Sequence, residues 1–312
     1  MTPRRAVPRI RGLAAVAWLA PMIGVAVPAR ADDPRPGVTH GFLATGNATY
    51  IRDERGAITW RYPHSTRDGW VLPDGHVLLA LSKGRDYPGG GVVEVEKTGR
   101  VVFEYKGTQS EVNTAQRLDG GLTLISEAGD RPRLLEVDRQ GRVVVEVPIR
   151  AQTKDHHLQT RMARKLANGH YLVPQLLDRV VREYTARGEI TWEVKTPDMP
   201  FTAIRLPGGG TLIGCTRGNL VVEVDPKGET TWQVSNADLP GAPINDACGV
   251  QRLPDGNTVI ASYGARGGEV KLIEVTPGKK LAWVHRDAGS PSIHHFQILD
   301  TDGKPTEGVP LR

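Results

Sequence analysis

The stretch "LPGGGTLIGCTRGNLVVEVDPKGETTW", from Leu206 to Trp232, decides the fold. Its glycine triplet could suggest a phosphate-binding loop, but such a loop leads into a helix, whose N-terminal amides hold the phosphate. Here the triplet leads into three short β-type runs, which are separated by the turn sequences "TRGN" and "PKGE". The glycines therefore mark a hairpin turn.

Both halves of this stretch recur along the chain. The first half is a leucine, a glycine turn and an apolar run; it occurs again at residues 72–79, 118–125, 166–173 and 253–260, with a weaker copy at 298–305. The second half, "EVDPKGETTW", has counterparts at residues 51–60, 94–103, 136–145, 183–192 and 274–283. Short strands with a glycine and an aromatic residue in each unit, at a fixed period, are typical of a β-propeller.

The repeats predict an all-β chain, a six-bladed β-propeller with four-stranded blades. Residues 32–312 provide about 47 residues per unit, the length of one such blade. The first unit begins at its second strand, and the last ends after its first strand, "IHHFQIL". We therefore expect N-terminal strands B, C and D to share a blade with a C-terminal strand A, which closes the ring. The tryptophans of the repeats should pack between blades: Trp60, Trp192, Trp232 and Trp283.

Residues 1–31 have the features of a signal peptide. They contain five arginines, no acidic residue, an apolar run and the small-residue site Ala29-Arg30-Ala31. We expect cleavage before Asp32, a single propeller domain over residues 32–312, and a periplasmic or secreted protein without a membrane span. An uncleaved anchor is the alternative, because the apolar run is near the lower limit of about 18 residues for a span.

The charge balance argues against a nucleic-acid partner. Five of the 40 basic residues lie within residues 1–31, so the rest of the chain carries 35 basic and 35 acidic residues. Nucleic-acid binding needs an excess of positive surface charge, and this balance offers none.

The alternation of "LPDGNTVI" with "EVDPKGETTW" resembles the repeats of bacterial secreted propellers of the PQQ-like type. It resembles more closely the six-bladed propeller of the arylsulfotransferase family, over essentially all of residues 32–312. The resemblance implies a nucleophilic histidine in the central channel, assisted by further histidine and arginine residues. It does not imply a bound quinone, and the sequence itself requires no cofactor.

Functional residues of a propeller gather at one mouth of its channel, where each strand A begins. Positions four and five residues before the repeated leucine vary and are mostly polar, which predicts a binding mouth. With nearby histidines and an aspartate, the candidate ligand-binding residues are Arg67, Asp68, Asn113, His156, His157, Arg161, Asp246, His294 and His295. The candidate catalytic residues are His157, His294 and His295.

The motifs "DHHLQ" and "IHHFQ" each contain two adjacent histidines. In an extended strand, adjacent side chains point to opposite faces, so four histidines cannot share one ion and no metal site is expected. Two histidines with Asp155, Asp246 or Asp68 remain an open alternative. By the same alternation, one of His294 and His295 should face the mouth while the other packs inward.

Cys215 and Cys248 should both lie near the same mouth. An exported protein can oxidise such a pair to a disulfide if the two Cα atoms lie within about 7 Å of each other. The sequence leaves this open.

Two functions remain. The first is a monomeric exported propeller whose mouth binds a small polar or anionic ligand or a partner protein. The second is an enzyme that uses a mouth histidine, either in group transfer of the arylsulfotransferase type or in a metal-dependent reaction. We favour the first, because the sequence contains no complete catalytic set.

Overall fold

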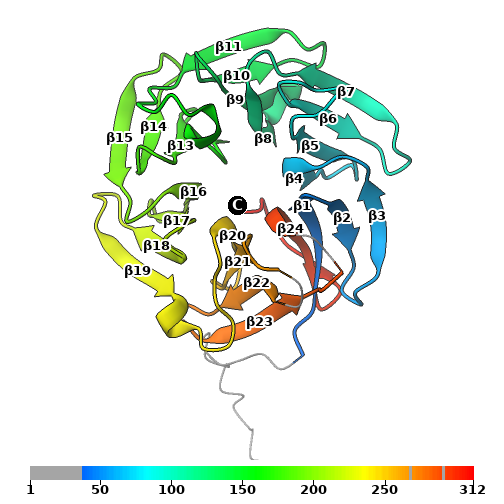
Figure 1. The fold of residues 1–312 in the computed structure, drawn as a ribbon, viewed down its shortest axis with the longest axis vertical. Helices are drawn as coiled ribbons and strands as arrows, with labels where there is room; N and C mark the ends of the chain where they lie inside the picture. Colours follow the sequence, from blue (N-terminus) through cyan, green and yellow to red (C-terminus); the bar gives the residue numbers. More distant parts are fainter. Residues whose placement is uncertain (1–36, 267–268, 290–291) are drawn as a thin grey trace, which may run out of the picture. The chain divides into compact units, whose positions relative to one another are not determined.

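The computed structural model describes residues 37–266, 269–289 and 292–312, so the predicted signal peptide lies outside the described residues. These residues form six antiparallel sheets around a central channel (Figure 1). The prediction of a six-bladed β-propeller with four-stranded blades is confirmed. Within the described ranges, no helix has the length and apolar character needed to cross a membrane.

Blade 1 contains both ends of the described chain, as predicted. Its sheet order is β25 (Lys304–Pro305), β24 (Ile293–Thr301), β1 (His40–Gly46), β2 (Thr49–Arg52) and β3 (Ile58–Tyr62). The C-terminal strand β24 pairs antiparallel with β1 from His40 opposite Thr301 to Gly46 opposite Ile293. This pairing closes the ring and covers the edge of β1 that its pairing with β2 leaves free.

Blades 2 to 6 each use four strands in chain order. Blade 2 consists of β4 (Thr66–Val71), β5 (Val77–Leu81), β6 (Gly91–Val95) and β7 (Val101–Lys106). Blade 3 consists of β8 (Glu111–Arg117), β9 (Thr123–Ala128), β10 (Arg133–Val137) and β11 (Val143–Pro148), with the 3-10 turn η1 (Asp119–Gly121). Blade 4 consists of β12 (Arg164–Lys165), β13 (Tyr171–Gln175), β14 (Val180–Tyr184) and β15 (Ile190–Lys195), preceded by η2 (His156–Leu158).

The last two complete blades have the same plan. Blade 5 consists of β16 (Pro200–Arg205), β17 (Thr211–Cys215), β18 (Leu220–Val224) and β19 (Thr230–Ser235), followed by η3 (Asn236–Asp238). Blade 6 consists of β20 (Ala247–Arg252), β21 (Thr258–Ser262), β22 (Val270–Val275) and β23 (Leu281–Arg286). In blades 2, 3, 5 and 6 the first strand lies nearest the centre, as β24 does in blade 1, and the last strand of every blade lies at the rim (Figure 1).

The glycine triplet is a turn, as expected. Leu206 N–H donates to Gly210 O at 2.9 Å, and Gly209 N–H donates to Leu206 O at 2.9 Å. Gly209 has φ +84°, which a residue with a side chain adopts only at a cost. The triplet therefore joins β16 to β17 and holds no phosphate.

The core is divided among the blade interfaces. Six apolar clusters each combine residues of two neighbouring blades; the cluster between blades 5 and 6, for example, contains Leu212, Val221, Val250 and Ile260. All four repeat tryptophans pack against these clusters, as predicted. The blades are therefore held together chiefly by apolar burial.

The first strand of blade 4 is shorter than its counterparts. Strand β12 has two residues, and its partner strand β13 contains Pro174. Proline has no backbone N–H to donate to a neighbouring strand, so the ladder cannot extend in the usual pattern. Arg161 N–H instead donates to Pro174 O at 3.3 Å.

Candidate functional site

β-Bulges set the direction of the mouth residues. Pairing between the first two strands of a blade skips one residue in blades 2, 3 and 5, namely Arg67, Asn113 and Phe201. Blade 1 skips His294, and blade 6 skips Cys248 together with Gly249. A bulge leaves its extra residue out of the ladder and turns its side chain away from the regular alternation. The residues that stand five positions before the repeated leucine in the six units therefore form a ring at the channel mouth, and we call this the ring position.

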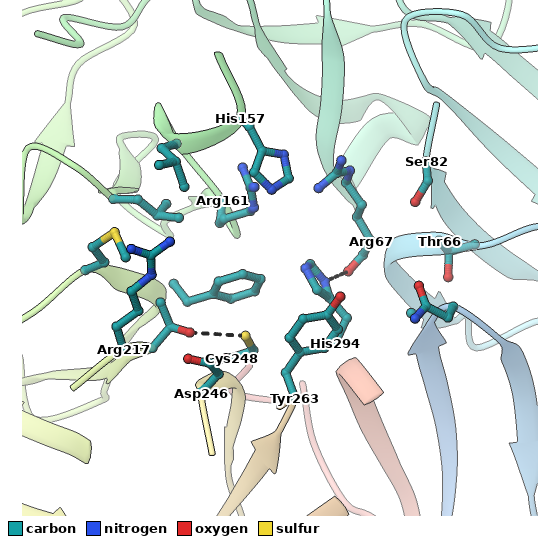
Figure 2. A pocket seen from close by; sticks show the side chains of 17 residues that line it. Thr66, Arg67, Ser82, His157, Arg161, Arg217, Asp246, Cys248, Tyr263 and His294 are labelled. Carbon is teal, nitrogen blue, oxygen red and sulfur yellow. Dashed lines mark hydrogen bonds between the residues drawn. The ribbon is translucent and has the colours of Figure 1, made fainter. Parts of the chain in front are cut away.

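Four of these residues, namely Arg67, Phe201, Cys248 and His294, line a pocket of about 280 Å³ at the channel mouth together with Arg161 of blade 4 (Figure 2). This volume lies just below the range of about 300–1,000 Å³ that is usual for small-molecule sites. The predicted residues Arg67, His157, Arg161, Asp246 and His294 contribute to its walls. The structure thus brings five of the nine candidates together.

Arg161 is a buried charge of the pocket that has no ion pair among the described residues. It is 2 % exposed, and no carboxylate of the described residues lies within ion-pair distance of it. Its Nη1 donates to Thr160 O at 2.8 Å, and its Nε is buried without a partner. Burial, reinforced by the positive charge of Arg67, lowers the pKa of Arg161 to about 9, so the group stays charged at neutral pH.

Polar groups without partners continue in the neighbouring blades. Arg67 Nε and both amide atoms of the buried Asn113 have no hydrogen-bond partner. Asn113 has the ring position of blade 3 but does not itself line the pocket. A buried polar group costs about 1–3 kcal/mol when it is unsatisfied. The sector formed by blades 2 to 4 therefore has unused hydrogen-bonding capacity.

Glu111 is a carboxylate that lies close to nitrogen atoms of three side chains of this sector. It lies 3.3 Å from Arg67 Nη2, 3.2 Å from Lys83 Nζ and 3.1 Å from His157 Nδ1. Burial raises the pKa of Glu111, but the hydrogen bond from His157 and the charge of Arg67 outweigh it and lower the pKa to about 2. Glu111 is ionised and compensates Arg67.

His294 is a neutral imidazole with a defined tautomer. Its Nδ1 lies 3.0 Å from the carbonyl oxygen of Arg67, which can only accept, so Nδ1 carries the proton. Burial and the charges of Arg67 and Arg161 lower the pKa of His294 to about 3. Its ring makes edge contacts with Phe201 at 4.6 Å and Tyr263 at 5.2 Å between ring centroids. The ring therefore offers a lone pair at Nε2.

His295 points into the channel instead. It is fully buried, and its Nδ1 accepts a hydrogen bond from Arg312 Nη2. Asp68 accepts from Arg164 Nη1 at 2.8 Å and from Arg312 Nη2 at 3.2 Å. The side chains of Asp68 and His295 thus belong to a second, inner layer around Arg312, which lies near the centre of the ring (Figure 1).

The histidines of blade 4 do not join those of blade 1 in one cluster. Residues 156–158 form the turn η2, not an extended strand, so the expectation of strand alternation there is wrong. His156 contacts Ser110 Oγ at 2.7 Å and Asp130 at 3.1 Å, while Asp155 caps the turn by accepting from His157 N–H. Only His157 reaches the pocket.

Both cysteines are free thiols. Cys248 lines the pocket, and its Sγ lies 3.5 Å from Thr216 Oγ1 (Figure 2). Burial raises the pKa of the Cys248 thiol to about 12, and burial also raises the pKa of Cys215 to about 12. Neither is a thiolate nucleophile at neutral pH.

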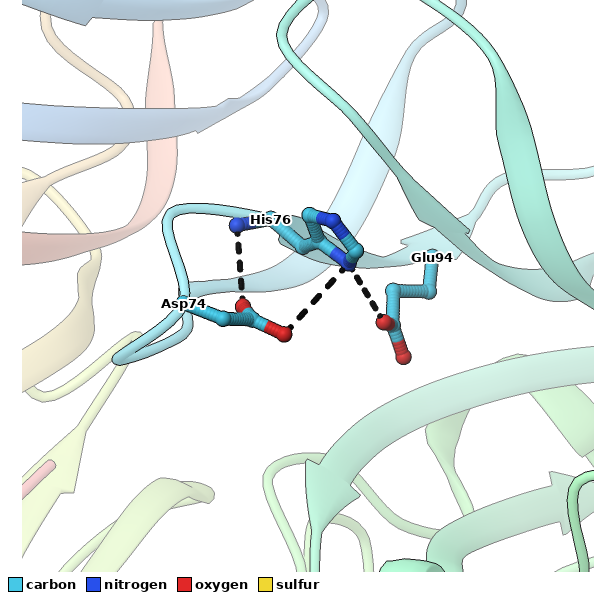
Figure 3. A group of neighbouring side chains, drawn as sticks. All are labelled: Asp74, His76 and Glu94. Atoms are coloured by element: carbon cyan, nitrogen blue, oxygen red, sulfur yellow. Dashed lines mark hydrogen bonds and ion pairs between the residues drawn. The ribbon is translucent and has the colours of Figure 1, made fainter.

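One group of described side chains has the composition of a metal site, and it lies outside the pocket. Asp74, His76 and Glu94 place their ligand atoms within 4.8 Å of one another (Figure 3). Glu94, however, also binds Arg117 Nη2 and, at 2.6 Å, Arg139 Nη1. Two guanidinium groups already compensate this carboxylate, so the group is a network between blades 2 and 3.

Several pocket residues escaped the sequence analysis. Arg217 and Tyr263 lie in turns between the second and third strands, and Met199 precedes β16. These positions have no counterpart in the repeated motifs, so register could not indicate them. Glu111, which contacts Arg67 and His157, stands two residues before the candidate Asn113, so its position relative to the repeat could have indicated it.

No family model matches the chain, and no curated protein sequence matches it. The resemblance to PQQ-like and arylsulfotransferase repeats therefore stays a prediction. Among solved structures, a protein of unknown function from Bacteroides caccae is 22% identical, with a TM-score of 0.74 over 83% of this chain and 98% of that one.

Two enzymes share the fold. A catalytically inactive histidine-to-alanine variant of virginiamycin B lyase from Staphylococcus aureus, solved with quinupristin, is 14% identical, with a TM-score of 0.58 over 83% of this chain and 92% of that one. The periplasmic gluconolactonase of Pseudomonas aeruginosa is 14% identical, with a TM-score of 0.55 over 82% and 84%. At these identities the similarity establishes the propeller fold alone.

Proposed function

We propose that this protein binds a small anionic ligand in the pocket at the channel mouth. The observation that carries the proposal is Arg161, a buried guanidinium with no ion pair among the described residues. Removing a charge from water is costly unless an opposite charge compensates it. A ligand anion would supply that charge, and Arg67 on the neighbouring wall would contribute a second donor group.

The test is an Arg161→Met variant, because methionine keeps the apolar stem and removes the charge. Calorimetric titration with sodium acetate and sodium sulfate in low-salt buffer should show binding to the wild type and none to the variant. The variant should melt at the same or a higher temperature, since burying a charge without an ion pair costs more than the single hydrogen bond to Thr160 O contributes.

The matched control is Arg179→Met, which removes a half-exposed arginine that pairs with Asp198 at 3.5 Å on the surface. It should leave anion binding unchanged. If neither anion binds the wild type, or if Arg161→Met binds as well as the wild type, the proposal is wrong.

A second candidate is an enzyme in which His294 acts as a base or nucleophile. Its neutral ring, with Nδ1–H held by the Arg67 carbonyl and Nε2 unprotonated, supports this reading. Solved structures that share the fold include a lyase and a gluconolactonase. Turnover of simple lactones that is lost in His294→Gln would favour the enzyme, whereas anion binding without turnover favours the binding protein.

We also propose export, based on residues 1–31. The protein recovered from the producing cell should have the intact mass of a chain that begins at Asp32. Retention of residues 1–31 would contradict this.

A further inference from the structure

The pocket has two chemically different walls. At the ring position, blades 2 to 4 supply Arg67, Asn113 and Arg161, whereas blades 5, 6 and 1 supply Phe201, Cys248 and His294. At this position the charged and amide side chains therefore occupy one continuous sector. The opposite sector has an aromatic ring, a thiol and a neutral imidazole at this position, and the charged residues that line the pocket on that side are Arg217 and Asp246.

The apolar wall continues beyond the ring. Met162, Leu176, Met199, Phe201 and Cys248 form a buried cluster, against which Leu158 and Tyr263 pack. The six other apolar clusters of the described residues fill the interfaces between neighbouring blades. This seventh cluster lies at the mouth, and most of its members line the pocket. Its apolar surface is available to a ligand.

The two walls meet at Arg161. Its guanidinium carbon lies 5.9 Å from the ring centroid of Phe201, within the range of a cation–π contact. An anionic group that binds Arg161 would therefore leave the rest of its molecule beside Phe201. The apolar contacts and the charge contact can then be made by one ligand.

One negative charge on the ligand is enough to balance Arg161. Arg67 is paired with Glu111, and Asp246 feels the positive charge of Arg217. Arg217 forms no ion pair among the described residues, but it is exposed to solvent, whereas Arg161 is buried and has no paired carboxylate in the same part of the chain. A ligand with a single carboxylate would therefore supply the charge that the buried part of the pocket lacks.

We propose that the pocket takes an amphipathic monocarboxylate, with its carboxylate on Arg161 and an apolar body against Phe201, Leu176 and Met199. This inference rests on the proposed function and specifies its ligand class. The carboxylate is the anion that the protein itself places in this sector, as Glu111. The volume of about 280 Å³ suits a body of one small ring or a short branched chain.

The wild-type protein can test this without any variant. Calorimetry would compare sodium acetate, which has the charge alone, with sodium cyclohexanecarboxylate, which has charge and body, and with cyclohexylmethanol, which has the body alone. We expect cyclohexanecarboxylate to bind at least about tenfold more tightly than either of the others, because only it uses both walls. Equal binding of the two carboxylates would overturn this inference while leaving the proposed function intact.

Two variants locate the apolar contact. Leu176→Ala should weaken cyclohexanecarboxylate binding about three- to tenfold and leave acetate binding unchanged. The neighbouring Leu177→Ala is the matched control, because Leu177 is exposed and does not line the pocket. Equal losses in both variants would overturn the placement of the apolar body. If cyclohexylmethanol binds as tightly as the carboxylate, the proposed anion site itself is wrong.

Discussion

Two adjacent residues, His294 and His295, have different environments: His294 is the bulge residue of β24, whereas His295 is paired in the ladder opposite Thr45. His294 faces the pocket with its proton on Nδ1, whereas His295 faces the channel and accepts at Nδ1 from Arg312. The positive charges nearest to each ring, Arg67 and Arg161 for one and Arg312 and Arg164 for the other, act with burial to lower both pKa values. Both rings are therefore neutral over the physiological range.

This neutrality predicts how stability depends on pH. A histidine whose pKa is about 3 when folded and about 6.5 when unfolded takes up its proton mainly in the unfolded state between these values, so stability falls as pH falls from about 6.5. Between about pH 7.5 and 5, His294 alone should reduce the free energy of unfolding by about 2 kcal/mol.

The His294→Gln variant checks this, because the glutamine amide can still donate to the Arg67 carbonyl. Urea unfolding at both pH values should show that the variant loses about 2 kcal/mol less than the wild type. The exposed His64→Gln is the control and should lose as much as the wild type. Equal losses in all three proteins would show that His294 is not held neutral.

For single residues, the sequence predicted which positions lie near the mouth better than it predicted where their side chains point. Counting back from the repeated leucine found the ring, since six copies place equivalent residues at equivalent points. It did not separate Arg67, in the pocket, from Asp68, in the inner layer, because the bulges that decide the direction leave no mark in the repeat. His157 likewise reaches the pocket through a 3-10 turn that was expected to be a strand.

Among the elements, strand β24 contributes both to the closure of the ring and to the pocket. It pairs with β1 on one side and with β25 on the other, and it carries His294 and His295. The segment that follows it returns to the channel, where Arg312 Nη1 donates to Gly69 O at 2.5 Å. Strand β24 therefore closes the ring, and the segment that follows it anchors the inner layer.

Two truncations separate these contributions. Deleting residues 293–312 removes β24 and exposes the edge of β1, so we expect aggregation or loss of cooperative unfolding. Deleting residues 306–312 keeps β24 and leaves Asp68 its contact with Arg164, so unfolding should stay cooperative with a loss of about 1–3 kcal/mol. Thermal melts followed by circular dichroism measure both; a sharp transition in the longer deletion would contradict the role of β24.

In the whole molecule, the six interfaces between neighbouring blades contain one of two kinds of side-chain contact, a polar pair or an apolar contact. In four of them a glutamate of the third strand binds a basic residue just before the repeated leucine of the next blade: Glu94 with Arg117, Glu136 with Lys165, Glu183 with Arg205 and Glu223 with Arg252. Between blades 6 and 1, His40 binds Glu274 at 2.9 Å. Between blades 1 and 2, Ile51 and Val71 occupy these positions and join one apolar cluster.

The fold was predictable because repetition averages out local ambiguity. A single stretch such as "LVVEVD" could belong to many β-proteins, but six copies in register admit few architectures. The pairing between blades was also present in the sequence, as the basic residue before the leucine, yet it has meaning only once neighbouring blades are placed side by side. The ligand could not be predicted, because it depends on turn residues that differ from blade to blade.

Because both kinds of contact occur in one molecule, we predict that an ion pair between two blades can be replaced by an apolar contact. Glu223 Oε2 lies 2.8 Å from Arg252 Nη2, and both side chains are partly buried. A partly exposed ion pair contributes little, and apolar residues of suitable volume can replace it without loss, but removing one partner leaves the other uncompensated.

We therefore expect Glu223→Ile alone and Arg252→Val alone each to destabilise the protein by about 1 kcal/mol, because each leaves a charge in the interface without its partner. The double variant, which reproduces the Ile51 and Val71 arrangement, should lie within about 0.5 kcal/mol of the wild type. Urea unfolding of the four proteins gives the coupling energy directly. The pair of Asp138 with the exposed Arg142, replaced in the same way, should show almost no coupling because both ends lie within one turn of one blade. A coupling as small for Glu223 and Arg252 would mean that the repeated ion pairs do not help hold neighbouring blades together.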